Sequence, residues 1–164
     1  YTLWKISRET ISLWDLTDEI LIIRCLSCKT KLNIKWGINS TNAKDCLVDY
    51  IGLVESRGFI LGSIIAHQLG KGVVLLRSKR NRLPGKTHSV AHTLEYGDSV
   101  VEVQEGSGKV LVFDDVLATG GTAKGSIEVL KKAGYTPTSA LFLVELDFLN
   151  PKLDVPHKSV IHYE

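Results

Sequence analysis

Two adjacent carboxylates and a glycine-threonine loop lie close together in the second half of the chain. Asp114 and Asp115 follow an unbroken apolar run, residues 110–113, and Thr119-Gly120-Gly121-Thr122 comes shortly after. Carboxylates accept hydrogen bonds from sugar hydroxyls, and threonine hydroxyls can donate to a ligand. Glycines let the backbone turn tightly and approach that ligand closely. A phosphate in the loop and a hydroxylated sugar against the carboxylates would satisfy every one of these groups.

The flanking segments indicate how these groups would be held. An apolar run without alternation is typical of a strand buried on both faces of a parallel sheet, and ligands bind outside the carboxyl ends of such strands. We therefore expect strand 110–113 to end where the two carboxylates begin. After Thr122, apolar residues recur at helical spacing up to Gly134, a typical stop. The loop thus opens a helix, whose unpaired N–H groups and dipole favour an anion.

The order of strand, paired acids and Thr-Gly-Gly-Thr resembles the signature of the phosphoribosyltransferases, which bind phosphoribosyl pyrophosphate (PRPP). The resemblance implies that Asp114 and Asp115 contact the ribose hydroxyls of PRPP, directly or through a metal. A glycine-rich surface turn is the alternative, but such a turn needs neither paired acids nor a second threonine. The resemblance also implies that the 5′-phosphate is cradled by Ala118, Thr119, Gly120, Gly121 and Thr122.

A second strand–loop–helix unit precedes the first. Residues 48–54 predict a strand, Glu55-Ser56-Arg57-Gly58-Phe59 a polar loop, and residues 60–69 a helix closed by Gly70. The planar fork of Arg57 suits a phosphate or pyrophosphate, although an arginine that caps the local fold has equal support from spacing alone. The run Glu-Ser-Arg-Gly-Phe resembles the pyrophosphate loop of the adenine phosphoribosyltransferases. It implies that Ser56 and Arg57 contact PRPP.

A short apolar strand, residues 73–76, leads into a basic segment, residues 77–86. A solvated charged face is the ordinary interpretation of such a segment. Nucleic-acid binding is a second interpretation, but no aromatic residues interleave for base stacking. A basic arm over pyrophosphate is the third, because the Leu-Pro-Gly ending again resembles the adenine enzymes. We assign Lys79 and Arg82 to PRPP, with Arg80 as an alternative, since this segment is one residue longer than the usual family pattern.

Residues 88–105 alternate apolar and polar side chains around a turn, which predicts a β-hairpin. Leu94-Glu95-Tyr96-Gly97 resembles the mobile active-site loop of the same family. The resemblance implies a lid that closes over substrate and excludes water, with Glu95 as a general acid toward the base and Tyr96 covering the site. An ordinary exposed hairpin is the alternative.

Residues 1–46 carry weaker signals. The run Leu13-Trp14-Asp15-Leu16-Thr17 resembles the family's small hood over adenine, but with Leu13 in place of phenylalanine and Trp14 in place of a basic residue. We predict that Leu13 and Trp14 contact the base, Trp14 by stacking. A helix is also expected in this part of the chain, because apolar residues recur at helical spacing: Leu16, Ile20, Ile23 and Leu26.

Composition limits the class of protein. A chain of 164 residues can form one domain with a sizeable core. A net charge of +2 does not indicate a polyanionic partner, and we expect no nucleic acid or membrane partner, since no apolar run is long enough to span a bilayer. No secretory signal is recognised, and three cysteines, an odd number, favour a reducing, cytoplasmic setting. Cys25 and Cys28 lack the further ligands of a zinc site, so no protein-built metal site is predicted.

These signals predict an α/β fold, with a mainly parallel twisted sheet of about five strands and helices on both faces. A small N-terminal hood, residues 1–46, and a β-hairpin lid complete it. Residues 47–164 form the core, with a flexible loop at about 78–104. The implied reaction is attack of adenine N9 on the anomeric carbon of PRPP, which yields AMP and pyrophosphate in purine salvage. Catalysis is assigned to Glu95, Asp114, Asp115 and Arg57.

The resemblance also implies a homodimer, and we expect Mg²⁺ held mainly by PRPP or pyrophosphate oxygens and water. Three other functions stay open. The first is the same chemistry with hypoxanthine, guanine or xanthine. The second is a non-catalytic PRPP-binding regulator, although residues 1–46 show no clear helix-turn-helix. The third is a nucleic-acid-binding protein that uses the basic segment, whose binding would weaken steeply with salt.

Overall fold

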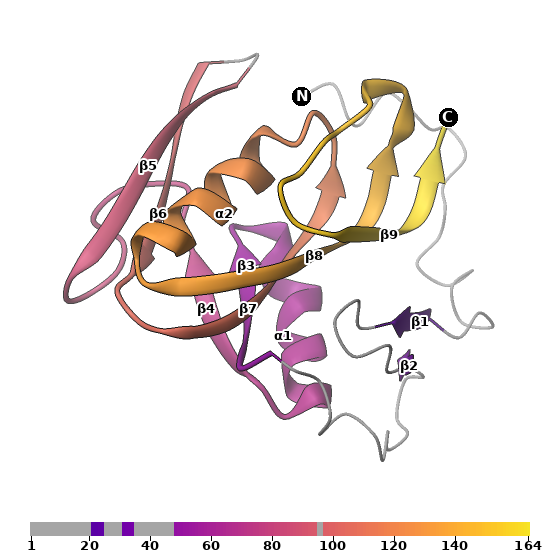
Figure 1. The fold of residues 1–164 in the computed structure, drawn as a ribbon, viewed down its shortest axis with the longest axis horizontal. Coiled ribbons are helices and arrows are strands. Elements are labelled where there is room, and N and C mark those ends of the chain that lie inside the picture. The colour runs from indigo at the N-terminus through magenta and orange to yellow at the C-terminus, as the bar shows by residue number, and fades with distance from the viewer. Residues whose placement is uncertain (1–20, 25–30, 35–47, 95–96) are drawn as a thin grey trace.

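The centre of the fold is a parallel sheet (Figure 1). The computed structural model describes residues 21–24, 31–34, 48–94 and 97–164. The five strands of the sheet lie in the order β4-β3-β7-β8-β9, and every neighbouring pair is parallel. The predicted α/β sheet of about five strands is therefore confirmed. The strands are β3 (Tyr50–Val54), β4 (Gly72–Leu76), β7 (Gly108–Leu117), β8 (Tyr135–Leu146) and β9 (His157–Tyr163).

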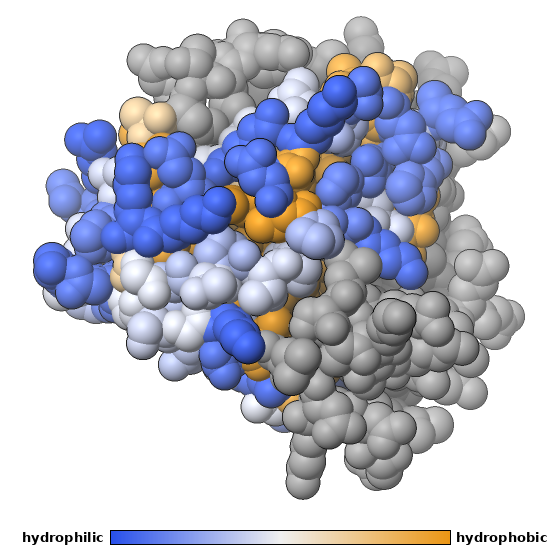
Figure 2. All heavy atoms as spheres, viewed as in Figure 1, coloured by the Kyte–Doolittle hydropathy of each residue, from blue (hydrophilic) through white to orange (hydrophobic). Residues whose placement is uncertain are grey.

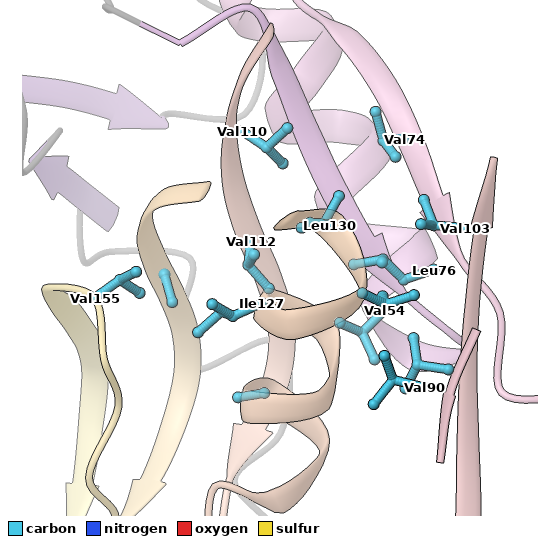
Figure 3. Packing of buried hydrophobic residues seen from close by; sticks show 14 of the residues in the cluster. Val54, Val74, Leu76, Val90, Val103, Val110, Val112, Ile127, Leu130 and Val155 are labelled. Atoms are coloured by element: carbon cyan, nitrogen blue, oxygen red, sulfur yellow. The ribbon is translucent and has the colours of Figure 1, made fainter. Parts of the chain in front are cut away.

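Helices α1 (Arg57–Leu69) and α2 (Gly121–Lys132) cover opposite faces of this sheet. Successive residues of the central strands alternate between two cores: Leu111 and Phe113 pack with α1, whereas Val110 and Val112 pack with α2. Figure 3 shows this second core around Leu130. The alternation explains the unbroken apolar runs, because each strand buries both faces.

The connections place β3 and β7 at a switch in the direction of the chain. The chain runs from β3 through α1 to β4 on one side of the pair, and from β7 through α2 to β8 on the other. Right-handed crossovers in opposite directions put the two helices on opposite faces. In open α/β sheets, the crevice beyond the carboxyl ends of two such strands is where ligands bind.

The predicted hairpin is present as antiparallel strands β5 (Thr87–Leu94) and β6 (Gly97–Gln104). Its inner side packs against α2: Val90, Val101 and Val103 are buried in the α2-side core. The base of the hairpin is thus part of the core, and closure of its tip over a substrate stays a prediction.

Hydrophilic residues cover much of the molecular surface on the side that Figure 2 shows, and hydrophobic residues are visible between them.

Three elements differ clearly from those expected: strand β7, helix α1 and the segment 21–24. Strand β7 runs on through Asp114 and Asp115 to Leu117, because β8 continues beside it, pairing Asp114 with Phe142 and Leu117 with Glu145. The carboxylates therefore lie on a strand rather than after it, just beyond the last pairing of β7 with β3, at Phe113.

Helix α1 begins at Arg57, earlier than the predicted residue 60, because Gly58 lets its first turn pack closely on β7. The helix expected from Leu16 to Leu26 is wrong over residues 21–24, which form strand β1 (Leu21–Arg24), paired antiparallel with β2 (Lys31–Ile34). Cross-strand pairing there overrides a helical spacing that includes β-branched isoleucines. The predicted hood–core boundary, at residues 46–47, lies outside the described residues.

Candidate functional site

The first turn of α1 meets the end of β7 in the crevice beyond β3. A Cβ atom added to Gly58 would lie 3.0 Å from the carbonyl oxygen of Phe113 and 3.2 Å from Oδ1 of Asp114. Only glycine allows the helix to come this close without a shift of its neighbours. The contact puts Ser56 and Arg57, at the start of α1, beside the carboxylates of β7.

An ion pair joins the start of α1 to strand β7. The Arg57 Nε donates a hydrogen bond to Oδ2 of Asp115. This bond raises the pKa of the guanidinium above its ordinary value, so Arg57 stays charged. The Arg57 side chain is 65% exposed, and a guanidinium has five N–H donors, so the remaining donors face solvent. The structure therefore brings together Arg57, Asp114 and Asp115, as the assignment to one site requires.

Asp114 is the more enclosed of the two carboxylates. Its Oδ1 accepts a hydrogen bond of 2.8 Å from the backbone N–H of Asp115. Burial raises the pKa of Asp114 to about 8, and the neighbouring carboxylate of Asp115 adds to the rise, while the Arg57 charge opposes it. At neutral pH the free protein thus keeps a proton on Asp114. A bound cation or donor hydroxyl would favour its carboxylate form.

The loop after β7 presents the N-terminus of α2 to the same crevice. Gly120 occupies the N-cap with φ of 85°, a left-handed conformation that favours glycine. Gly120 has no side chain to cap the helix, so the first backbone N–H groups of α2 are available to an anion. Thr119 is exposed at this end, and Gly121 and Thr122 form the first turn. Their placement fits the predicted phosphate cradle.

The basic segment 77–86 is tied to the same edge through Glu55, which directly precedes Ser56. Oε1 of Glu55 lies 3.2 Å from Nη2 of Arg77. Oε2 of Glu55 accepts hydrogen bonds from the backbone N–H of Ser78 at 2.7 Å and from its hydroxyl at 3.0 Å. The Arg77 guanidinium also lies over the Phe59 ring, 5.7 Å from its centroid.

Sequence reasoning assigned no role to Glu55 or Arg77. A signal was present, because each residue directly follows one of two apolar runs that become adjacent parallel strands. Of the assigned PRPP contacts, Lys79 and Arg82 lie exposed on the segment, as does the alternative, Arg80. The remaining assigned residues lie outside the part of the chain whose side chains the structure describes, and their roles stay predictions: Glu95, Tyr96, Leu13 and Trp14.

Side chains at two places in the described part of the chain could hold a metal ion. Asp114 and Asp115 offer oxygen ligands of the kind that Mg²⁺ prefers, beside the proposed phosphate sites. Glu145, Asp147 and His162 place ligand atoms within 4.8 Å of one another near the ends of β8 and β9. That second group is already paired internally, since Nδ1 of His162 lies 3.0 Å from Oδ1 of Asp147.

Among the described residues, no helix is long and apolar enough to cross a membrane.

Comparison with known proteins decides the family. Residues 49–144, more than half of the chain, match the phosphoribosyl transferase domain. The chain belongs to the phosphoribosyltransferase family. The matched residues include Arg57, both carboxylates of β7, the start of α2 and the basic segment 77–86.

Relatives within this family are adenine phosphoribosyltransferases. The enzyme of Roseobacter denitrificans is 48% identical over 103 residues, covering 60% of this chain and 58% of the relative. That of Desulforamulus reducens is 49% identical over 113 residues, covering 66% and 65%. This phosphoribosyltransferase chain thus spans less than two thirds of the length of both. The Saccharomyces cerevisiae enzyme, solved with adenine, matches with a TM-score of 0.65 and 34% identity over 69% of this chain and 67% of that one.

Proposed function

We propose that this chain transfers the phosphoribosyl group of PRPP to adenine and forms AMP and pyrophosphate, a reaction of purine salvage. One observation carries the proposal: Arg57, the first residue of α1, pairs with Asp115 of β7 at the switch point of the sheet. A cation for pyrophosphate and a carboxylate for ribose are thereby adjacent. PRPP requires this arrangement, because its pyrophosphate is bonded to C1 of its ribose. The relatives named adenine phosphoribosyltransferase support the choice of base.

The residues have complementary roles in the proposed reaction. As the bond to pyrophosphate breaks, positive charge develops on the ribose and negative charge on the leaving group. Asp114 and Asp115 stabilise the first, and Arg57 with the basic segment stabilises the second. The N-terminus of α2 holds the 5′-phosphate. Fixing both substrates in line contributes on the order of 7–11 kcal/mol in the best-oriented cases.

The base subsite rests on the predicted residues of the hood and the hairpin tip. Glu95 would act as the general acid toward adenine and Tyr96 would cover it. Leu13 and Trp14 would form the hood, with Trp14 stacked on the base. These assignments follow from the resemblance of the two runs to the adenine enzymes, and mutation of each residue tests them through the KM for adenine.

Mg²⁺ fits the oxygen-rich donor set at the end of β7. Asp114 and Asp115 are the nearest protein carboxylates, and most ligands would come from the pyrophosphate oxygens of PRPP and from water. When bound, the ion neutralises charge on the leaving group. The protein's own contribution is to place the carboxylates and to keep Arg57 beside them.

We also propose that the chain forms a homodimer in a reducing, cytoplasmic setting. Helix α1 and edge strand β4 expose large apolar side chains, which would gain stability when covered by a second copy. Sedimentation of the wild-type protein beside an Ile60→Asp, Val73→Asp double variant tests this surface, and a monomeric wild type contradicts it. The exposed residues are Ile60, Ile64, Val73 and Leu75.

A panel of bases tests the proposed function. Purified protein is incubated with PRPP, Mg²⁺ and one of adenine, hypoxanthine, guanine or xanthine, and the nucleotide product is measured by chromatography. We expect AMP from adenine and no product from the other bases. Product from another base alone would move the base assignment. PRPP binding in calorimetry without any product would instead favour the regulator.

A further inference from the structure

Glu102 is a buried carboxylate on strand β6. Its exposed fraction is 2%. Its chain neighbours Val101 and Val103 are also buried, on the side of the strand that packs against α2. Because successive side chains of a strand point to opposite faces, Glu102 points away from α2. The residues it contacts there belong to the basic segment 77–86 and to Thr87, which follows it.

The Glu102 carboxylate accepts three hydrogen bonds from that side. Oε1 accepts from the backbone N–H of Asn81 at 3.1 Å and from the Thr87 hydroxyl at 3.0 Å, and Oε2 accepts from the backbone N–H of Arg82 at 3.1 Å. Its own backbone pairs with Arg77 in both directions, at 2.8 Å each. One residue therefore holds the segment at its start, in its middle and just after its end.

The charge of Glu102 is balanced by the segment that it organises. Burial alone would raise the pKa of the carboxyl, but the N–H groups of Arg82 and Asn81, the Thr87 hydroxyl and the Arg80 charge hold it below its ordinary value. Hydrogen bonds to an ionised acceptor are the stronger kind. A neutral amide in its place would turn one acceptor into a donor that faces N–H or O–H groups.

The geometry points to Glu102 as a positioning residue that orders segment 77–86 so that Lys79, Arg80 and Arg82 are held at the pyrophosphate subsite. Glu55 anchors Ser78 at the near end, and Glu102 anchors Asn81, Arg82 and Thr87 beyond it. Without these two anchors the segment would move freely, and its cations would not stay at one position. This inference rests on the proposed function, because it takes the pyrophosphate of PRPP as the ligand.

The test compares Glu102→Gln with Glu105→Gln. Glu105 also contacts this region, through Lys86 at 2.6 Å and His88 at 2.9 Å, but its side chain is 45% exposed and accepts no hydrogen bond from a backbone N–H of the described residues 78–85. We expect Glu102→Gln to raise the KM for PRPP about tenfold, while the KM for adenine stays within about twofold of wild type. Glu105→Gln leaves both unchanged.

A second readout is independent of turnover. Trypsin cleaves after lysine and arginine, so its initial rate of cleavage within residues 79–86 reports how well the segment is held. We expect Glu102→Gln to be cleaved at least about tenfold faster there than wild type or Glu105→Gln, because opening of the segment controls cleavage. Equal cleavage rates and an unchanged KM for PRPP would overturn the inference.

Thr87 provides a milder pair of variants in case Glu102→Gln does not fold. Thr87→Val removes one donor to Glu102 at nearly constant volume, and Thr87→Ser keeps it. We expect a smaller rise in the KM for PRPP and in cleavage for Thr87→Val, and wild-type values for Thr87→Ser. Equal behaviour of the two variants would count against the inference. A wild-type protein without PRPP turnover would overturn the proposed function, while the cleavage rates still decide whether Glu102 orders the segment.

Discussion

The contact between Arg57 and Asp115 joins two residues that are 58 positions apart in the sequence. Their residue types indicate different partners, a pyrophosphate for the guanidinium and ribose hydroxyls for the carboxylate. In PRPP the pyrophosphate is bonded to C1 of the ribose and the hydroxyls to the next two ring carbons, so the side chains proposed to recognise them must be neighbours. The motifs predicted each residue, but the pairing depends on the adjacency of β3 and β7.

We expect Arg57→Ala to lower kcat at least tenfold (about 1.4 kcal/mol or more). The variant removes the cation that we propose acts at the leaving group, and it leaves Asp115 without its ion-pair partner. Steady-state rates at saturating adenine and PRPP measure the loss. Lys132→Ala is the matched control, because it removes an exposed cation that pairs with Glu128 on the same helix, α2, and it should keep the wild-type kcat.

Asp114 makes the stability of the free protein depend on pH. Its pKa is about 8 in the folded protein, above the ordinary value of 3.8. The folded state therefore binds this proton more tightly than the unfolded state does. The resulting contribution to the free energy of unfolding is complete below about pH 4 and is lost as pH rises toward 8. Wild-type Tm should fall over this range in the absence of PRPP and Mg²⁺.

Asp114→Asn cannot lose that proton. We expect thermal unfolding to show a Tm for the variant above wild type at pH 8.5, with the difference shrinking at pH 5. A difference in Tm that stays constant at every pH would contradict the raised pKa of Asp114 as its cause.

The Asp114→Asn variant should also lose turnover at least tenfold (about 1.4 kcal/mol), since the amide cannot oppose positive charge on the ribose.

At the scale of elements, the position of α1 depends on glycines that face β3 and β7. Gly58 is the one nearest the site, and its missing Cβ is what lets α1 reach Asp114. We expect Gly58→Ala to cost about 1–3 kcal/mol in unfolding free energy, the usual range for overpacking. Because the helix must move off the end of β7, the KM for PRPP should rise as well. Urea unfolding and steady-state kinetics measure the two effects.

Gln68→Ala is the control for this change, since Gln68 is exposed on the same helix. It should leave both the urea midpoint and the KM for PRPP near wild type. A Gly58→Ala variant as stable and as active as Gln68→Ala would show that α1 does not need its close approach to β7.

Most elements were predictable from local pattern, and the misses have a common cause. Helices α1 and α2, strands β3, β4 and β7 and the hairpin follow from apolar spacing and from turn glycines such as Gly70 and Gly134. The length of β7 and the start of α1 were missed, because both depend on a neighbour: β8 extends β7, and β7 receives the first turn of α1. Strand β1 was missed because its pairing with β2 overrides a helical spacing.

At the scale of the whole molecule, the strand order decides which predicted residues form a site. The two motif loops each end a parallel strand, and the order β4-β3-β7-β8-β9 puts those strands side by side with their crossovers running in opposite directions. Residue types together with the family resemblance of the two motifs predicted a site with Arg57, Asp114 and Asp115. Glu55 and Glu102 were missed, because the role of an acidic residue in a strand or loop depends on hydrogen-bond partners that are distant in the sequence.

The initial rate of AMP formation tests the central claim most directly. Adenine, PRPP and Mg²⁺ are mixed with wild type, Arg57→Ala or Asp114→Asn, and AMP and pyrophosphate are both quantified. We expect equal amounts of the two products from wild type and at least tenfold lower rates from each variant. No AMP from wild type, or unchanged rates in both variants, would contradict it.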